Sequence, residues 1–502
     1  MRFSPRNVVG LVVSLAIPIV VGCTTSFVKS AGGFGGDSPS SGEAQQNVCS
    51  GSTVGGFDGV GGGPGIPPGV WAKRYGDAED QRALAVAVNN AGEIAIAGAA
   101  KGTINFGNLD WTGSATDTDV VIAKLSSDGY ALWSRRYGDS CDQRGSAVAH
   151  TPAGNVLLAG DFCGKMDFGN TAVETKGAEI DAFVVMLDAL GEDVYSRSFG
   201  GNGAQILRGA AVDAKGNAVL VGSFDQAFDA GAGIAQTAGL DDSFVVELDP
   251  KGNVLWSLTL GGPGADIARS VAVDPLGNVI VGGSFAGTID LGDGPVTATV
   301  GHTNGFLLAL DPGGKHLWSK SFGGDDDVVI GSVAAGPDGE VAATGYFLGT
   351  ADLGSGPTTS SGAEDGFVEV TSNAGDHVWG MTVGGEKFQR GTGVAIGANG
   401  DVVISGVSDE IVPLNTTLQS MLIGTAPGFF GPSMGYALRF DAAGTPLAVW
   451  EVDNGGPIES AGVGIDGTQG IVLAGSFKKS LGFLAGTLVT SGGWDVFVAR
   501  AQ

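Results

Sequence analysis

Basic residues are scarce in this sequence, and that scarcity excludes one class of partner. Among the 502 residues, 26 are Lys or Arg and 53 are Asp or Glu, so the formal net charge is −27 at pH 7. Nucleic acids are bound through basic patches that meet their phosphates, so we expect no nucleic-acid partner. The acidic surface favours solubility, and cation binding is the alternative left open.

Motifs of the common enzyme classes are missing as well. The sequence contains no Gly-x-Ser-x-Gly motif, no Walker loop and no Cys-x-x-Cys pair. Its four histidines are not spaced as ligands of one metal ion: His150, His302, His316 and His377. Collagen is excluded because the 90 glycines follow no Gly-X-Y period. No catalytic residue is therefore predicted, and no organic cofactor is indicated.

The one long apolar run lies at the N-terminus. Arg2 and Arg6 precede an apolar stretch from Val8 to Val21. The stretch is interrupted by Pro18 and is shorter than the roughly 20 residues of a spanning helix. A basic start followed by a short apolar run is typical of a secretory signal.

The end of this segment, Val20-Val21-Gly22-Cys23, resembles the lipobox of bacterial lipoproteins. The resemblance implies that residues 1–22 are a lipoprotein signal peptide and that Cys23 becomes the lipidated first residue. Since no Asp follows the cysteine, the sorting rule of that family implies the outer membrane of a Gram-negative bacterium. The expected location is the cell envelope, with the membrane as a partner through the lipid anchor.

Residues 23–69 are rich in Gly, Ser and Pro, as in AGGFGGDSPSSGE and GGGPGIPPG. This composition is typical of a flexible linker that buries no core. A linker of this length reaches roughly 40 Å on average. We expect a tether that holds the folded domain clear of the membrane.

Seven aromatic residues mark an internal repeat over the rest of the chain. They are spaced by 62, 62, 61, 62, 61 and 71 residues: Trp71, Trp133, Tyr195, Trp256, Trp318, Trp379 and Trp450. Within a repeat, apolar residues alternate with small or polar ones at period two, which predicts four strands. The turns carry a late Gly, as in a type I turn followed by a left-handed residue. A four-stranded antiparallel unit repeated at this period is typical of a propeller blade.

The two ends of the repeat region predict how the ring closes. Residues 70–76 form a fourth strand with no three strands before it, and residues 495–501 form a third strand with no fourth after it. Pairing these strands completes one blade and removes both exposed sheet edges. We predict an all-β domain at 70–501, a seven-bladed β-propeller of four-stranded antiparallel blades.

The repeats also carry a recurrent signature. Units of the form DxFVxxLDxxGxxxWxxxFGG, paired with AVDxxGNVxVxGSF, resemble the SBBP-type β-propeller repeats of bacterial surface and secreted proteins. The resemblance covers residues 70–501 and implies the propeller fold. It implies no activity, because the family has none in common.

Two kinds of residue recur in the repeats. The aromatic residues are expected to pack between neighbouring blades. Most third strands begin with an acidic residue, which is expected to accept hydrogen bonds from nearby backbone amides. These residues are Asp119, Asp181, Asp242, Asp365 and Asp495, with Asn304 in one blade. Periodic Ca²⁺ binding is the alternative, although no Asp-x-Asp-x-Asp-Gly loop occurs.

The strongest acidic cluster is Asp325, Asp326 and Asp327, in a loop that joins two blades. Ca²⁺ takes carboxylate and carbonyl oxygens as ligands. These three aspartates are the candidate metal site, with Ca²⁺ as the candidate ion.

The cysteines predict one disulfide. Cys141 lies just before the first strand of the second blade, and Cys163 lies just after its second strand. Because these strands are antiparallel neighbours, both cysteines lie at the same end of the blade, within reach of a disulfide. Cys49 in the tether is left over, either free or paired with another molecule.

The sixth blade carries an enlarged loop between its second and third strands, residues 408–434. We expect this loop on the face where the blade-joining loops emerge. Its apolar residues either pack down on the disc or form a contact patch. The candidate binding residues are Met421, Phe429, Phe430 and Met434.

These features favour a membrane-anchored surface lipoprotein whose propeller binds or scaffolds an unidentified protein or glycan. The alternative is a hydrolase or lyase that uses channel carboxylates as acid and base. It needs at least two acidic residues on the innermost strands, which read as small and apolar: ALAVAVN, SAVAH, GAAVD and SVAVD. Asp213 and Asp274 lie at the far ends of two of these strands and are expected in turns. A purely structural envelope protein is the third interpretation.

Overall fold

The computed structural model describes residues 56–61, 69–176, 179–231, 233–409, 434–452, 455–483 and 486–502. Residues Val54–Gln502 form one compact unit. Its described residues form β-strands and turns, and none of them belongs to a helix long and apolar enough to span a membrane. The predicted signal peptide, Cys23 and Cys49 lie outside the described residues.

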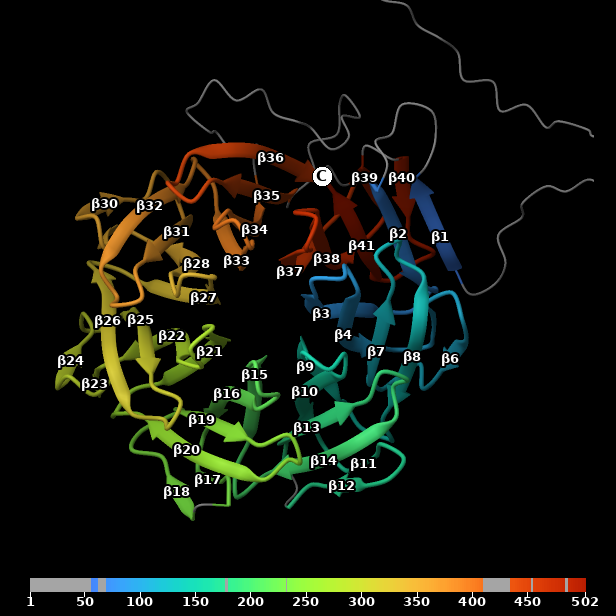
Figure 1. Cartoon of the computed structure of the whole chain (residues 1–502), viewed down its shortest axis with the longest axis horizontal. Helices are drawn as coiled ribbons and strands as arrows, with labels where there is room; N and C mark the ends of the chain where they lie inside the picture. The colour runs from blue at the N-terminus through green and yellow to red at the C-terminus, as the bar shows by residue number, and fades with distance from the viewer. Residues whose placement is uncertain are drawn as a thin grey trace, which may run out of the picture. The chain divides into compact units, whose positions relative to one another are not determined.

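Four-stranded antiparallel sheets follow one another around a ring (Figure 1). Blade one contains β3 (Gln81–Val88), β4 (Ile94–Ala100), β7 (Asp119–Leu125) and β8 (Ala131–Tyr137). Blade two contains β9 (Arg144–His150), β10 (Val156–Phe162), β13 (Asp181–Leu187) and β14 (Asp193–Phe199). Blade three contains β15 (Gln205–Val212), β16 (Ala218–Phe224), β19 (Asp242–Leu248) and β20 (Val254–Leu260). Blade four contains β21 (Asp266–Val273), β22 (Val279–Ala286), β25 (Thr303–Leu310) and β26 (His316–Gly324).

Blades five to seven complete the ring. Blade five contains β27 (Val328–Ala335), β28 (Val341–Phe347), β31 (Asp365–Thr371) and β32 (His377–Val383). Blade six contains β33 (Gln389–Ile396), β34 (Val402–Ser408), β35 (Met434–Phe440) and β36 (Pro446–Val452). Blade seven combines both ends of the repeat region: β37 (Ile458–Ile465), β38 (Ile471–Phe477), β41 (Asp495–Ala501) and β2 (Trp71–Gly76). The predicted all-β, seven-bladed propeller is confirmed.

The ring closes where the sequence predicts. β2 pairs antiparallel with β41, so that Trp71 lies opposite Arg500 and Tyr75 opposite Val496. A buried ion pair, 2.6 Å long, joins Arg74 of β2 to Asp495 of β41. The innermost strands contact one another in an unbroken circle: β3, β9, β15, β21, β27, β33, β37 and β3 again.

One strand of this seam was not predicted. β1 (Gly56–Gly61) lies in the segment assigned to the tether and pairs with the outer edge of β2, which makes the sheet of blade seven five-stranded. The Gly-rich segment has no alternation of apolar residues, so its sequence carries no strand signal. The open edge of β2 supplies its backbone hydrogen-bond partners.

Small hairpins in the loops between second and third strands were also not predicted. Their strands are three or four residues long, which is too short for a periodicity signal. They are β5 (Thr103–Asn105) with β6 (Asp110–Thr112), β11 (Lys165–Asp167) with β12 (Ala172–Glu174), β17 (Ala227–Asp229) with β18 (Ile234–Gln236), β23 (Thr288–Asp290) with β24 (Pro295–Thr297), β29 (Thr350–Asp352) with β30 (Pro357–Thr359), and β39 (Ser480–Phe483) with β40 (Gly486–Val489).

The hydrophobic core is divided among the gaps between blades. In one gap, Val120 and Ile122 of blade one pack with Leu158 and Phe183 of blade two, and all four side chains are fully buried. Each blade is therefore held by its neighbours as well as by its own ladder of hydrogen bonds. The innermost strands are fixed in place, and side chains at their ends project from a rigid frame.

Candidate functional site

The first strand of each blade starts, and the second strand ends, at the same face of the ring. In blade two, for example, Arg144 at the start of β9 lies opposite Asp161 near the end of β10. The small hairpins follow the second strands, so they emerge at this face, which we call the hairpin face.

A β-bulge interrupts the innermost strand of every blade near this face. One residue of each strand has no partner in the second strand, which frees its side chain from the alternation of the sheet. These bulged residues are Leu84, Ser146, Arg208, Arg269, Gly331, Thr392 and Ala461. The first six of them line a single cavity.

A glycine in the second strand makes each bulge fit. A Cβ added to Gly160 would lie 1.9 Å from the carbonyl oxygen of Arg144, and one added to Gly222 would lie 2.1 Å from that of Ile206. The same close approach recurs in the other blades at Gly98, Gly283, Gly345, Gly406 and Gly475. The glycine of the repeated VxGSF motif is therefore a signal of the bulge opposite it.

The cavity lies at the mouth of the central channel, because it is lined by the innermost strands of blades one to six. Its volume is about 530 Å³. Four arginines and one carboxylate line it: Arg144, Arg208, Arg269, Arg390 and Asp161. Four of the 26 basic residues of a strongly acidic chain thus converge on one cavity.

Two of these arginines have carboxylate partners. Arg144 Nε lies 3.4 Å from Asp161 Oδ2. Arg390 binds both oxygens of Glu364 and lies over the ring of Tyr346, 4.6 Å from its centre. These contacts hold both side chains at the rim of the cavity.

The other two arginines have no carboxylate partner within ion-pair distance in the described part of the chain. Nε of Arg208 is buried and has no hydrogen bond to any described residue. Arg269 donates two hydrogen bonds of 3.2 and 3.4 Å to the hydroxyl of Ser284, which is uncharged. Arg208 and Arg269 are therefore the two arginines of the cavity without an ion-pair partner among the described residues.

Burial and neighbouring positive charge both lower the pKa values of Arg208 and Arg269. Burial lowers the pKa of Arg208, and the charge of Arg144 lowers it further, while Asp161 and Asp241 oppose the shift. Burial also lowers the pKa of Arg269, and the charge of Arg208 adds to that effect. The cavity favours any bound group that supplies negative charge.

The opposite mouth of the channel has another character. A cavity of about 310 Å³ is lined there by Asp213 and Asp274. Asp213 Oδ1 accepts hydrogen bonds of 2.8 Å from the N–H groups of Lys215 and Asn217, and Asp274 makes the same pair of bonds in blade four. Both aspartates are turn residues, as predicted. Since Asp161 is the one carboxylate among the described residues of the arginine cavity, the hydrolase or lyase alternative gains no support.

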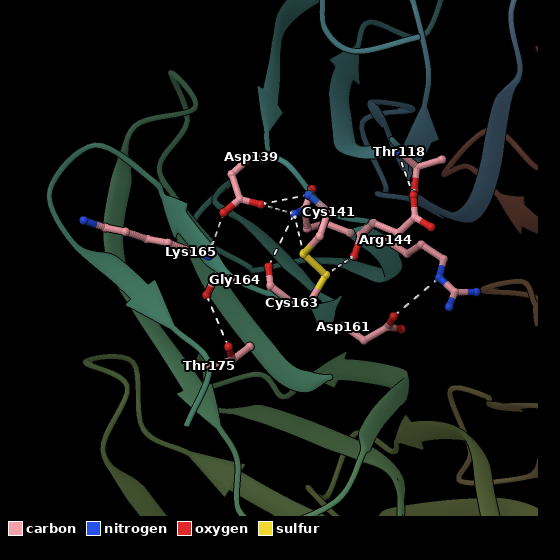
Figure 2. The surroundings of a disulfide bond; sticks show 11 residues. Thr118, Asp139, Cys141, Arg144, Asp161, Cys163, Gly164, Lys165 and Thr175 are labelled. Carbon is pink, nitrogen blue, oxygen red and sulfur yellow. Dashed lines mark hydrogen bonds and ion pairs between the residues drawn. A yellow bond between two sulfur atoms is a disulfide. The ribbon is translucent and has the colours of Figure 1, made fainter. Parts of the chain in front are cut away.

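The predicted disulfide is present beside this cavity. Cys141 and Cys163 are bonded, with their Cα atoms 6.1 Å apart. Figure 2 shows the bond between the carboxylate of Asp139 and the Arg144–Asp161 ion pair. The disulfide joins the start of β9 to the end of β10 and so fixes this part of the hairpin face.

The aspartates that open the third strands divide into two groups. Three accept a backbone hydrogen bond of 2.9 Å from the preceding loop, as predicted: Asp181, Asp242 and Asp365. Asp119 pairs with Arg136, and Asp495 pairs with Arg74, both on fourth strands; Asp495 also accepts a backbone hydrogen bond from Ser491. These carboxylates bind loops and fourth strands of their own blades, and they are not among the described residues that line the arginine cavity.

The predicted acidic cluster is rearranged in the structure. Oxygens of Asp326 and Asp327 and a ring nitrogen of His302 all lie within 4.8 Å of one another. Asp325 is not part of this group, because its carboxylate accepts the N–H of Thr350. An imidazole suits transition metals, whereas Ca²⁺ takes oxygen ligands. Ca²⁺ binding at Asp325–Asp327 stays a prediction.

The candidate residues of the blade-six loop are placed only in part. Met434 begins β35, is half-buried and lies opposite Ser408. Met421, Phe429 and Phe430 lie outside the described residues. Because Ser408 also pairs with Gln389 at the start of β33, Ser408 and Met434 lie at the hairpin face, and residues 410–433 between them lie outside the described residues.

His377 on β32 has a buried partner. Its Nδ1 lies 2.7 Å from a carboxylate oxygen of Glu369, which is 1% exposed. Burial raises the pKa of Glu369 to about 7, although the bond to His377 opposes the rise. The pair lies on β31 and β32 of blade five, away from the innermost strands.

Comparison with known proteins identifies no family. No protein-family profile matches the chain. An uncharacterized WD repeat-containing protein of Acanthamoeba polyphaga mimivirus is 22% identical over 279 residues, which cover 46% of this chain and 20% of that protein. Regulatory protein FlaEY of Caulobacter vibrioides is 28% identical over 251 residues, which cover 48% of this chain and 25% of that protein.

Solved structures are similarly distant. Sqt1 from Chaetomium thermophilum aligns with a TM-score of 0.40 and 15% identity, over 84% of this chain and 98% of that one. The chain spans a quarter or less of the length of the two curated relatives above. The resemblance to SBBP-type repeats stays a prediction, and the fold assignment rests on the strand pairing.

No pattern recognised in the sequence predicted the arginine cavity. Its four arginines lie at or before the bulges, ahead of the apolar alternation that marks each innermost strand. A partial signal was present, since Gln-Arg occurs before the bulge at 143–144 and 389–390. The same pair occurs at 81–82, where Arg82 pairs with Glu459.

Proposed function

We propose that this chain is a lipid-anchored protein of the cell envelope whose propeller binds an acidic ligand at the hairpin-face mouth of its channel. The observation that carries this proposal is the convergence of four arginines from four blades in a chain with a net charge of −27. Most of such a surface repels anions, so a local cluster of cations favours the binding of an anionic group at this mouth.

Two further features support an extracytoplasmic location. The disulfide between Cys141 and Cys163 is of the kind that persists in oxidising compartments. The N-terminal segment ending at Cys23 has the pattern of a lipoprotein signal. The lipid anchor, the outer membrane and the SBBP assignment are parts of this proposal.

Binding is tested with the purified full chain immobilised and exposed to envelope extract. Thr392 is a bulged residue that lines the cavity, so Thr392→Trp fills the mouth without changing its charge. We expect the wild type to retain an acidic component that elutes with salt, and Thr392→Trp to lose it. Retention of the same component by both proteins, or of neutral components alone, would contradict the proposed site.

Anchoring is tested separately by metabolic labelling with palmitate in a Gram-negative host. The wild type is expected to incorporate label and to partition with outer membranes, whereas Cys23→Ser is expected to do neither. Label on Cys23→Ser, or an unlabelled wild type, would contradict the anchor and leave the binding proposal standing.

A further inference from the structure

We infer that Arg208 and Arg269 form an oxyanion subsite for a dianionic group, a phosphate monoester or a close pair of carboxylates, on a small organic ligand. The inference rests on the proposed function, because it names the ligand class of the same cavity.

The fold does not require arginine at either position. The equivalent bulged residues in the other five blades are Leu84, Ser146, Gly331, Thr392 and Ala461. A position that accepts side chains from Gly to Leu places no demand for a guanidinium group on the bulge itself. The bulge itself therefore does not require the two arginines.

The two guanidinium groups are placed to act together. Arg208 lies on β15 and Arg269 on β21, at equivalent positions of neighbouring strands that contact each other. Both residues line the same cavity, and the charge of Arg208 lowers the pKa of Arg269. A guanidinium group presents a planar fork of N–H donors that matches the oxygens of phosphate or carboxylate.

Charge matching favours a dianion. Arg144 forms an ion pair with Asp161, and Arg390 forms one with Glu364. Arg208 and Arg269 have no such partner within ion-pair distance among the described residues. Two adjacent, half-buried positive charges repel each other, and a bound group with two negative charges offsets that repulsion.

The cavity is larger than an oxyanion. At about 530 Å³ it lies within the range of sites that hold small organic molecules. Its remaining walls include apolar and aromatic side chains, those of Leu84, Ile206, Val329 and Tyr346. The ligand is thus expected to carry a carbon body beside its anionic group. The same phosphate chemistry occurs in free sugar phosphates and in lipid headgroups, and the experiment separates these sources.

The test is calorimetric titration and thermal unfolding of the full chain with inorganic phosphate, glucose 6-phosphate and glucose. All titrations are made at constant ionic strength set with chloride. We expect phosphate to bind and to raise the midpoint of thermal unfolding, glucose 6-phosphate to bind at least tenfold more tightly than phosphate, and glucose to have no effect. Vesicles with phosphatidic acid provide the lipid arm, and binding to vesicles without binding to glucose 6-phosphate would overturn the small-ligand assignment.

The decisive variant is Arg208→Thr with Arg269→Thr, which copies Thr392 of blade six. It is expected to weaken phosphate binding at least tenfold and, without anion, to unfold at the same or a higher temperature than the wild type, because two like charges are removed. The control is Lys215→Gln with Lys251→Gln, which changes the net charge equally at exposed turns and is expected to bind as the wild type does.

Two results would overturn the inference: phosphate that binds no better than chloride, or an arginine variant that binds as the wild type does. If either occurs while the Thr392→Trp variant still loses its acidic envelope component, the subsite is wrong and the proposed function stands. If the component is retained as well, both are wrong.

Discussion

An aromatic side chain on the outer strand of six blades packs on a glycine of the next blade. Trp133, for example, donates a hydrogen bond of 3.0 Å from Nε1 to the carbonyl oxygen of Ala189, and its ring covers Gly191. The six pairs are Trp71–Gly129, Trp133–Gly191, Tyr195–Gly252, Trp256–Gly314, Trp318–Gly375 and Trp379–Gly444. The predicted packing between blades is confirmed. Trp450 has no such turn to cover, because blade seven joins its third and fourth strands by pairing the chain ends.

Gly191 and Gly154 allow this contact to be separated from backbone strain. Both have positive φ, 80° and 85°, but a Cβ on Gly191 would lie 2.7 Å from the Trp133 ring, whereas one on Gly154 would meet nothing within 4 Å. Gly154→Ala is expected to cost about 1 kcal/mol, the price of a left-handed alanine. Gly191→Ala is expected to cost about 3 kcal/mol, because overpacking adds to the strain. Urea unfolding of both variants measures the difference, and equal costs would contradict the packing role.

Asp266 occupies a position that is neutral in other blades. Gln205, its counterpart in blade three, accepts the N–H of Gly201 and donates to the carbonyl oxygen of Ala227. Asp266 accepts the equivalent N–H, from Gly262, at 2.7 Å and is fully buried. Burial raises the pKa of Asp266 to about 6.

The raised pKa predicts the sign of a pH effect. Between about pH 4 and pH 6 folded Asp266 keeps a proton that the unfolded chain has released, so this residue makes the free energy of unfolding fall as pH rises through that window. Asp266→Gln is expected to remove this decrease in the free energy of unfolding, because glutamine does not titrate. It should stabilise the protein by about 2 kcal/mol at pH 7.5 and change little at pH 3.5. Urea unfolding at both pH values checks this, and an equal gain at both would assign the effect to packing.

At the scale of elements, the sequence predicts what repeats at period two. Each four-strand blade was predicted because its strands are seven to nine residues long or nearly so, long enough for alternation to show. The small hairpins and β1 were not, because three-residue strands and a Gly-rich strand carry no alternation. Glycines in the second strands mark the bulges. The predicted innermost strands, however, begin only after the bulge, as GAAVD does at Gly209 and SVAVD at Ser270. Arg208 and Arg269 lay outside the predicted channel lining for that reason.

The disulfide of blade two joins two elements that already pair, so its effect is expected on stability and not on fold. Cys141 and Cys163 are separated by 22 residues, and closing a loop of that size stabilises by about 3 kcal/mol in the chain-entropy description. Cys141→Ser with Cys163→Ser is expected to lose about that amount and to keep the circular dichroism of the wild type. A variant of unchanged stability would show that the bond does not form in solution, as would an intact mass that reductant does not change.

At the scale of the whole molecule, the pairing of the strands at the two ends of the repeat region determines the fold. The count of seven blades follows from an unmatched fourth strand at one end and an unmatched third strand at the other, which is why the sequence alone predicted closure. What the ring encloses depends on which side chains project from the inner strands, and that depends on bulges and charge pairing in three dimensions. The arginine cavity exists only because residues of blades one to six, from Leu84 to Thr392, meet at one mouth.

Closure is therefore the claim on which the cavity and the proposed site depend, and one engineered crosslink tests it most directly. Ala72 of β2 lies opposite Ala499 of β41. In a Cys49→Ser background, Ala72→Cys with Ala499→Cys is expected to oxidise to a disulfide that links the two ends of the ring, seen in the peptide map without reductant. Ala72→Cys with Ala501→Cys, shifted by two residues, is the control and is expected to stay reduced, because a diagonal pair lies about 7–8 Å apart. No crosslink in the first pair, or equal crosslinking in both, would contradict the closed ring.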